Sequence, residues 1–91
     1  MNATSEQNTT AIEVYGADWC GDCKRAKDAL NRCGAAYIWH DIEHEEGAAD
    51  RAVAISGQQH IPVVLYPDGT FQVEPAATAI RTKLTDLGLL G

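Results

Sequence analysis

The hydrophobic pattern begins with a stretch that suits a β-strand and then takes a helical spacing. Residues 11–15 alternate small or apolar with polar side chains and end at Gly16, which predicts a strand followed by a loop that runs to Trp19. From Cys23 onward, apolar residues recur at the i, i+3, i+4 and i+7 spacing of an amphipathic helix. Gly34 follows this stripe directly, and a glycine in that place closes a helix. The buried stripe of the predicted helix consists of Ala26, Ala29, Leu30 and Cys33.

The middle of the chain repeats this change from strand pattern to helix pattern. Residues 37–39 are aromatic and β-branched, which favours a second strand. The acidic connection 41–46 follows, and a second helical stripe over residues 48–55 ends near Gly57. The first half of the chain and this segment together predict the order strand, helix, strand, helix.

A hairpin and a last helix complete the pattern. Pro62 opens an apolar strand over residues 63–66, and the Pro-Asp-Gly sequence at 67–69 is a strong turn signal. Residues 70–73 are therefore the expected hairpin partner. Pro75 fits the first turn of a last helix. The buried side of that helix is expected to consist of Ala76, Ile80, Leu84 and Leu87.

The order of elements, β-α-β-α-β-β-α, predicts the α/β fold class. The first β-α-β unit implies a parallel pair of strands with a right-handed crossover, and the closing pair implies an antiparallel hairpin in the same sheet. Helices then cover both faces of a mixed, four-stranded sheet. Because 91 residues suffice for one domain and not for two, we expect a single domain over residues 11–91, preceded by a flexible polar tail over residues 1–10.

Composition and charge narrow the classes of function. Hydrophobic residues make up 45% and charged residues 22% of the chain, as in ordinary globular proteins. The net charge of −6, from 7 Lys+Arg against 13 Asp+Glu, argues against binding to nucleic acid or to an anionic membrane. Residues 1–10 lack the basic and apolar regions of a secretory signal. We therefore expect a cytoplasmic protein.

Two cysteines stand between the first predicted strand and the first predicted helix. A Cys-x-x-Cys pair such as Cys20 and Cys23 in this position is typical of a thiol redox site. Because the free N–H groups and the positive dipole end of a helix stabilise a thiolate, we expect Cys20 to be the nucleophile. Cys23, one turn further into the helix, is the expected buried resolving thiol. Their disulfide would close a very small loop, so we expect it to be reversible.

A zinc site is the main alternative for the cysteine pair, and it would need four ligands. The remaining candidates are Cys33, His40, His44 and His60, and none of them forms a second short-spaced pair. We therefore expect no metal and no bound organic cofactor. Cys33 completes an apolar stripe, which favours a core cysteine, with a regulatory or glutathionylated thiol as the alternative.

Charged and aromatic neighbours of Cys20 affect its reactivity in opposite directions. Lys24 and Arg25 favour the thiolate, whereas Asp22 disfavours it, so we expect Asp22 to make Cys20 less acidic than a neutral residue would. Water that screens Asp22 would remove this effect. Trp19 is expected either to flank the reactive sulfur with an apolar face for the substrate or to pack in the core.

Several motifs of this chain resemble those of the thioredoxin superfamily, most closely the glutaredoxin-like branch that includes mycoredoxins. The resemblance rests on residues 19–23, Asp41-Ile42 and Ile61-Pro62, covers residues 11–90, and implies the thioredoxin fold. It also implies that the peptide bond before Pro62 is cis and faces the cysteine pair, and that the backbone of Ile61 pairs with an incoming substrate or thiol. The candidate catalytic residues are Cys20 and Cys23, and the candidate substrate- and thiol-binding residues are Trp19, Gly21, Asp22, Ile61 and Pro62.

Departures from the glutaredoxin motifs bear on the thiol co-substrate. Glutaredoxins usually carry Cys-Pro-Tyr-Cys where this chain has Gly21-Asp22 between the cysteines, and Thr-Val where it has His60-Ile61. Their Gly-Gly pair and following aspartate, which holds the γ-glutamyl amine of glutathione, are absent from residues 71–77. This stretch is similar to mycoredoxins, whose mycothiol lacks the two carboxylates of glutathione, and such a neutral thiol suits an acidic protein.

The resemblance implies a small thiol–disulfide oxidoreductase that acts through Cys20, with Cys23 or a second small thiol as the resolving group. We expect a monomer with mycothiol or glutathione as co-substrate, disulfide-containing proteins as substrates, and a flavin-dependent reductase as the source of electrons. One alternative is a thioredoxin- or NrdH-like electron donor reduced directly by thioredoxin reductase. The other is an iron–sulfur carrier, in which Cys20 of two subunits and two small thiols hold a 2Fe–2S cluster.

Overall fold

A computed structural model describes residues 11–90 of the chain. The tail expected over residues 1–10 lies outside the described residues, as does Gly91. The elements follow the predicted order: β1 (Ile12–Gly16), α2 (Gly21–Arg32), β2 (Tyr37–Asp41), α3 (Ala48–Ser56), β3 (Val63–Leu65), β4 (Phe71–Val73) and α4 (Ala77–Leu87). Within residues 11–90, none of the helices is both long and apolar enough to cross a bilayer.

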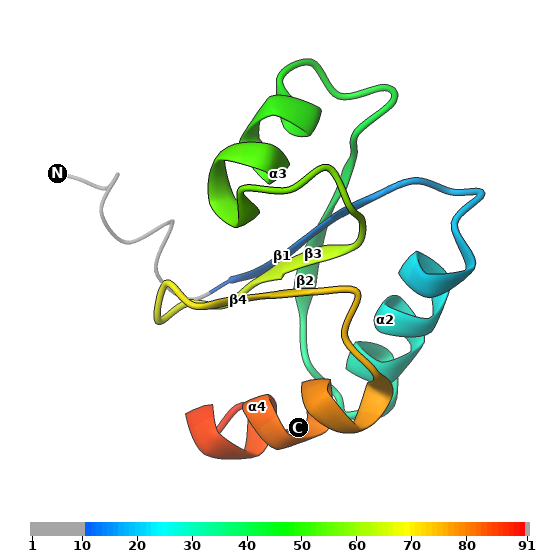
Figure 1. Cartoon of the computed structure of the whole chain (residues 1–91). Helices are drawn as coiled ribbons and strands as arrows, with labels where there is room; N and C mark the ends of the chain where they lie inside the picture. The colour runs from blue at the N-terminus through cyan, green and yellow to red at the C-terminus, as the bar shows by residue number, and fades with distance from the viewer. Residues whose placement is uncertain (1–10, 91) are drawn as a thin grey trace, which may run out of the picture.

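The strands form one mixed sheet in the order β2-β1-β3-β4. Strand β1 runs parallel to β2, with Ile12 opposite Tyr37 and Gly16 opposite Asp41, and antiparallel to β3, which in turn pairs antiparallel with β4. Helix α3 covers one face of this sheet, and α2 and α4 cover the other (Figure 1). The α/β class and the mixed sheet with helices on both faces are therefore confirmed.

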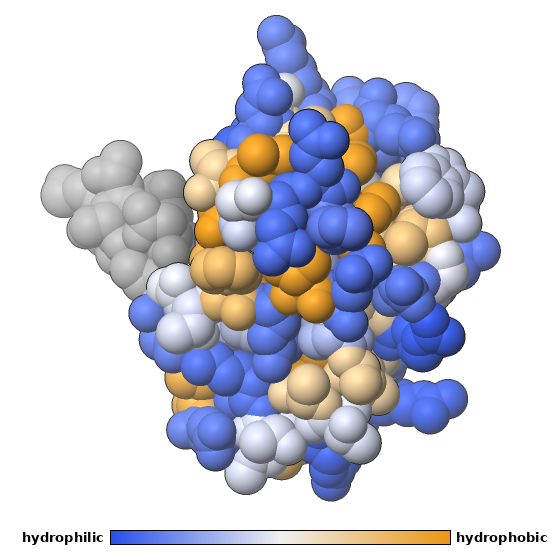
Figure 2. All heavy atoms as spheres, viewed as in Figure 1, coloured by the Kyte–Doolittle hydropathy of each residue, from blue (hydrophilic) through white to orange (hydrophobic). Residues whose placement is uncertain are grey.

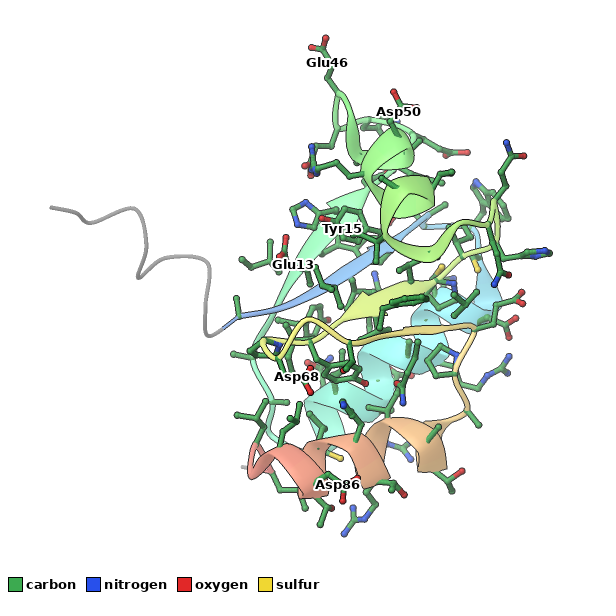
Figure 3. The ribbon with its side chains drawn as sticks, turned by 60° about the vertical axis from the view of Figure 1, so that its left-hand side comes forward. Glu13, Tyr15, Glu46, Asp50, Asp68 and Asp86 are labelled. Carbon is green, nitrogen blue, oxygen red and sulfur yellow. The ribbon has the colours of Figure 1, made fainter. Side chains whose placement is uncertain are left out.

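The two faces of the sheet bury cores of different size. Alternate residues of β1 point to opposite faces: Val14 lies in the large core beneath α2 and α4, and Tyr15 lies in the small core beneath α3 (Figure 3). Cys33 belongs to the large core, as its place in the apolar stripe predicted. Over α3, apolar residues also reach the surface between hydrophilic ones (Figure 2), among them Val53.

The start of α4 differs from the prediction. Pro75 does not lie in the first turn, because Ala76 is the extended N-cap and the helix begins only after it. The preceding residue, Glu74, has a positive φ of 50° and donates its backbone N–H to the carbonyl of Pro62 at 2.9 Å. This contact keeps the chain at the end of the sheet, so that α4 begins two residues later than the sequence predicts. As a result Ala76 is exposed, and the buried side of the helix begins at Ile80.

Candidate functional site

The loop after β1 leads directly into α2, at the right of Figure 1, and Cys20 is the N-cap of that helix. Its backbone is extended, with φ −85° and ψ 118°, and its Sγ accepts a hydrogen bond from the backbone N–H of Cys23 at 3.3 Å. Because the Cys20 side chain caps the first turn, α2 begins at Gly21, two residues before the apolar stripe. A free amide of the helix start therefore points at the sulfur predicted to be the nucleophile.

The two cysteine side chains differ in burial. Cys23 is fully buried, whereas Cys20 keeps 9% of its surface exposed, and both are free thiols. Burial and the hydrogen bond with Cys20 raise the pKa of the Cys23 thiol to about 12. An amide hydrogen bond from Ala17 and the charge of Lys27 lower this pKa, but by less. Cys23 is therefore protonated at neutral pH, and its sulfur is less accessible to solvent than the sulfur of Cys20.

Gly16, at the end of β1, leaves the space in which Cys23 lies. A Cβ on Gly16 would overlap Cys23 Sγ and would lie 2.9 Å from Cη2 of Trp39, closer than real Cβ atoms approach other atoms. Sequence reasoning missed both Gly16 and Trp39 as parts of the site. A glycine directly after a strand is a weak signal of close approach, and nothing in the sequence placed Trp39 beside the cysteines.

The peptide bond between Ile61 and Pro62 is cis, as the resemblance implied. Pro62 is buried, and the half-buried Ile61 packs, together with Trp39, against the small cluster of Ala17, Cys20 and Cys23. The loop before β3, the strand that pairs with β1, thus lies against the cysteine pair.

The other three candidate residues lie on the open side of the site. Trp19 is 68% exposed and donates its indole N–H to Glu43 at 2.7 Å, so it is not a core residue. Asp22 forms an ion pair with Arg25, and both side chains are about half exposed or more. Gly21 is exposed, with open space where a Cβ would lie.

A hollow of about 240 Å³ lies between α3 and the loop that leads to Pro62. One of its walls is Ile61, which connects it to the cysteine cluster. Its polar lining comes from Asp50, Gln58, Gln59 and His60. None of the described residues that line it is a lysine or an arginine. The other lining residues are apolar, so the hollow suits a neutral group better than a carboxylate.

The histidines considered as zinc ligands have other partners. His40 lies between two carboxylates, with Nε2 2.8 Å from Glu13 and Nδ1 2.9 Å from Glu45. His44 Nδ1 lies 2.9 Å from Asp41. Among residues 11–90, no group of three or more His, Cys, Asp and Glu side chains is arranged to hold a metal ion. The structure does not bring these histidines to the cysteine pair.

Comparison with known proteins decides the family. The family model described as Glutaredoxin matches residues 12–71. The chain belongs to the glutaredoxin family. It is 35% identical over 80 residues to a candidate glutaredoxin of Mycobacterium tuberculosis (strain ATCC 25618 / H37Rv), covering 87% of this chain and 95% of the relative. It is 29% identical over 77 residues to Mycoredoxin 1 of Corynebacterium glutamicum, covering 84% and 95%.

Solved glutaredoxins share the fold. A glutaredoxin of Archaeoglobus fulgidus matches with a TM-score of 0.73 at 23% identity, over 90% of this chain and 94% of that one. A buckwheat glutaredoxin in complex with glutathione matches with a TM-score of 0.67 at 21% identity, over 96% and 84%. Membership of the family, together with the close Cys20 and Cys23 pair, makes this glutaredoxin a thiol–disulfide oxidoreductase.

Proposed function

We propose that Cys20 is the nucleophile and Cys23 the resolving thiol of a reaction in which a low-molecular-weight thiol reduces disulfides of other proteins. The observation that carries this proposal is the hydrogen bond from the Cys23 backbone N–H to Cys20 Sγ. An amide at a helix start stabilises a sulfur anion more than a neutral thiol. For Cys23, burial outweighs the amide hydrogen bond from Ala17 and raises the pKa of the thiol to about 12.

The proposed cycle conserves atoms and electrons. The Cys20 thiolate attacks a substrate disulfide, forms a mixed disulfide with one sulfur and releases the other as a thiolate. Cys23 loses its proton and attacks Cys20 Sγ, so that the Cys20–Cys23 bond forms and the second substrate thiolate leaves. The substrate gains two electrons and the cysteine pair loses two. Two molecules of the small thiol return these electrons and are themselves oxidised to a disulfide.

Substrate binding is assigned to the open side of the site. The backbone of Ile61, next to Pro62, pairs with the incoming chain or thiol, and the exposed ring of Trp19 offers it an apolar face. Gly21 leaves the approach to Cys20 open, and Asp22 borders it. The packing of Ile61 against the cysteine cluster and the 68% exposure of Trp19 support this assignment.

Mycothiol is the co-substrate that the site favours over glutathione. Glutathione carries two carboxylates, and the hollow beside Ile61 contains Asp50 with no described lysine or arginine to pair with them. Mycothiol lacks these carboxylates, so it avoids the unfavourable charge. The similarity to Mycoredoxin 1 of Corynebacterium glutamicum supports the same choice.

The remaining partners follow from this chemistry. The oxidised small thiol requires a flavin-dependent reductase to regenerate it. The exchange needs a reducing compartment, which the cytoplasm provides. One chain carries both cysteines and needs no second subunit for the cycle, so the protein acts as a monomer.

The test is a turnover comparison in which glutathione, mycothiol and thioredoxin reductase each serve as reductant for a protein disulfide. We expect mycothiol with its reductase to support the highest rate, no activity in Cys20→Ser, and residual activity in Cys23→Ser through a second small thiol. Loss of activity in Cys23→Ser alone would overturn the assignment of roles. Turnover with thioredoxin reductase alone would favour the thioredoxin- or NrdH-like donor, and a brown dimer after anaerobic purification would favour the iron–sulfur carrier.

A further inference from the structure

We propose that Lys27 is a positioning residue for the resolving step, in which its ammonium group, held against the ring of Trp39, stabilises the thiolate form of Cys23. The inference rests on the proposed function, because it concerns a step that only the two-cysteine cycle contains. It adds a specific role for a side chain that does not touch the substrate.

The helix places Lys27 beside Cys23. The two residues are four apart on α2, a spacing that brings side chains to the same face of a helix. Lys27 is half-buried, and its Nζ lies 3.8 Å from the ring centroid of Trp39. A cation at this distance over an indole ring is attracted by the negative face of the ring, so the ammonium group is held in place against α2.

Trp39 is the residue that joins Lys27 to the cysteines. Its ring packs against the cluster of Ala17, Cys20 and Cys23. The Cη2 atom of Trp39 and the Sγ atom of Cys23 both lie so close to Gly16 that neither leaves space for a Cβ there. The cation, the ring and the buried sulfur are therefore neighbours in one packed unit.

The other basic residues of α2 are placed differently. Lys24, Arg25 and Arg32 are exposed, and Arg25 is paired with Asp22. Charges in water are screened, whereas a charge beside a buried group acts through a medium of lower dielectric constant. Lys27 is thus the α2 cation whose charge reaches Cys23 most strongly, and its charge lowers the pKa that burial raises.

The step that Lys27 assists begins with a mixed disulfide on Cys20. Cys23 must release its proton to solvent before its sulfur attacks Cys20 Sγ, forms the Cys20–Cys23 bond and expels the substrate thiolate. A buried anion without a partner is unfavourable, and the ammonium group of Lys27 supplies that partner. In the reverse direction, Cys23 leaves as the same thiolate when a small thiol attacks Cys20.

The aromatic disulfide DTNB separates the resolving step from the attack by Cys20, because each of these two steps releases one coloured thiolate. In stopped-flow measurements on the Cys33→Ala background, the first thiolate reports attack by Cys20 and the second reports resolution by Cys23. We expect Lys27→Met to slow the second phase by about 3- to 10-fold, as one pKa unit is tenfold, and to leave the first phase unchanged. Lys27→Arg restores the second phase.

Two controls make the outcome decisive. Arg32→Met removes one positive charge from the exposed last turn of α2 and should leave both phases as they are. Cys23→Ser should release a single thiolate, at a rate that Lys27→Met does not alter. An unchanged second phase in Lys27→Met, equal slowing of both phases, or the same slowing in Arg32→Met would overturn the role of Lys27. A first phase that persists in Cys20→Ser would instead refute the proposed function.

Discussion

The two ends of α2 each carry a cysteine, and the two are alike in burial but not in electrostatics. Cys20 is the N-cap and Cys33 the C-cap, and each keeps 9% of its surface exposed. The sulfur of Cys20 accepts an amide hydrogen bond, whereas that of Cys33 lies in the large apolar core. Cys33 also lies at the end where the helix dipole is negative.

Burial alone does not distinguish these two thiols. A helix start presents free N–H groups that stabilise an anion, and a helix end presents groups that destabilise it. We therefore expect the same side chain, with the same exposed fraction, to differ in reactivity between the two ends. Each prediction below changes one part of this difference.

The largest expected effect comes from replacing each of these two cysteines in a separate variant. We predict that Cys20→Ser lowers turnover of a protein disulfide by roughly three orders of magnitude or more, because the nucleophile of the covalent step is lost. Cys33→Ala should keep turnover within about twofold, since its sulfur only fills the core. A steady-state assay of both variants checks this, and comparable losses in the two would contradict the contrast between the ends.

The packing of the N-terminal end gives the next largest effect. Gly16→Ala should lower the free energy of unfolding by about 1–3 kcal/mol, because its Cβ would overlap Cys23 Sγ and Trp39. Gly21→Ala is the matched control, since its Cβ meets nothing within 4 Å, and it should change stability by less than about 1 kcal/mol. Urea unfolding measures both, and equal midpoints would refute the close packing.

A pH effect follows from the raised pKa of Cys23. The folded state holds this pKa at about 12, above the value of about 8.5 in an unfolded chain. The stabilisation from the neutral thiol is therefore fully present below about pH 8.5 and is lost as the pH rises toward 12. Unfolding free energies from pH 8 to 10 should fall more steeply in the wild type than in Cys23→Ala, by up to about 1.4 kcal/mol per pH unit. Parallel slopes would argue against a raised pKa.

The smallest expected effect concerns Asp22. Its carboxylate lies in the first turn of α2, and a negative charge disfavours a nearby thiolate, but the ion pair with Arg25 offsets part of that charge. Asp22→Asn should raise the alkylation rate of Cys20 at pH 6 by about twofold, the size expected of an exposed charge. A rate that stays the same would show that Asp22 is screened by water and by its partner, and a rate that falls would contradict the unfavourable effect of its charge.

The sequence predicts the order of elements because strand and helix spacings differ clearly along this chain. It predicts a redox role for the cysteine pair because a Cys-x-x-Cys at a strand–helix junction places a sulfur beside the free N–H groups of the helix. It does not predict the contacts of Gly16, Lys27 and Trp39, since these depend on the register that places β2 beside β1. The start of α4 escaped prediction for a similar reason, because the contact of Glu74 with Pro62 joins residues far apart in sequence.

Site-resolved alkylation of the reduced wild-type protein tests most directly that the helix start makes Cys20 the reactive sulfur. The modification of each cysteine by iodoacetamide at pH 7 is followed over time by peptide mass spectrometry. We predict that Cys20 reacts at least about tenfold faster than Cys33 at pH 7. Equal rates at the two cysteines, or a faster reaction at Cys33, would contradict the account.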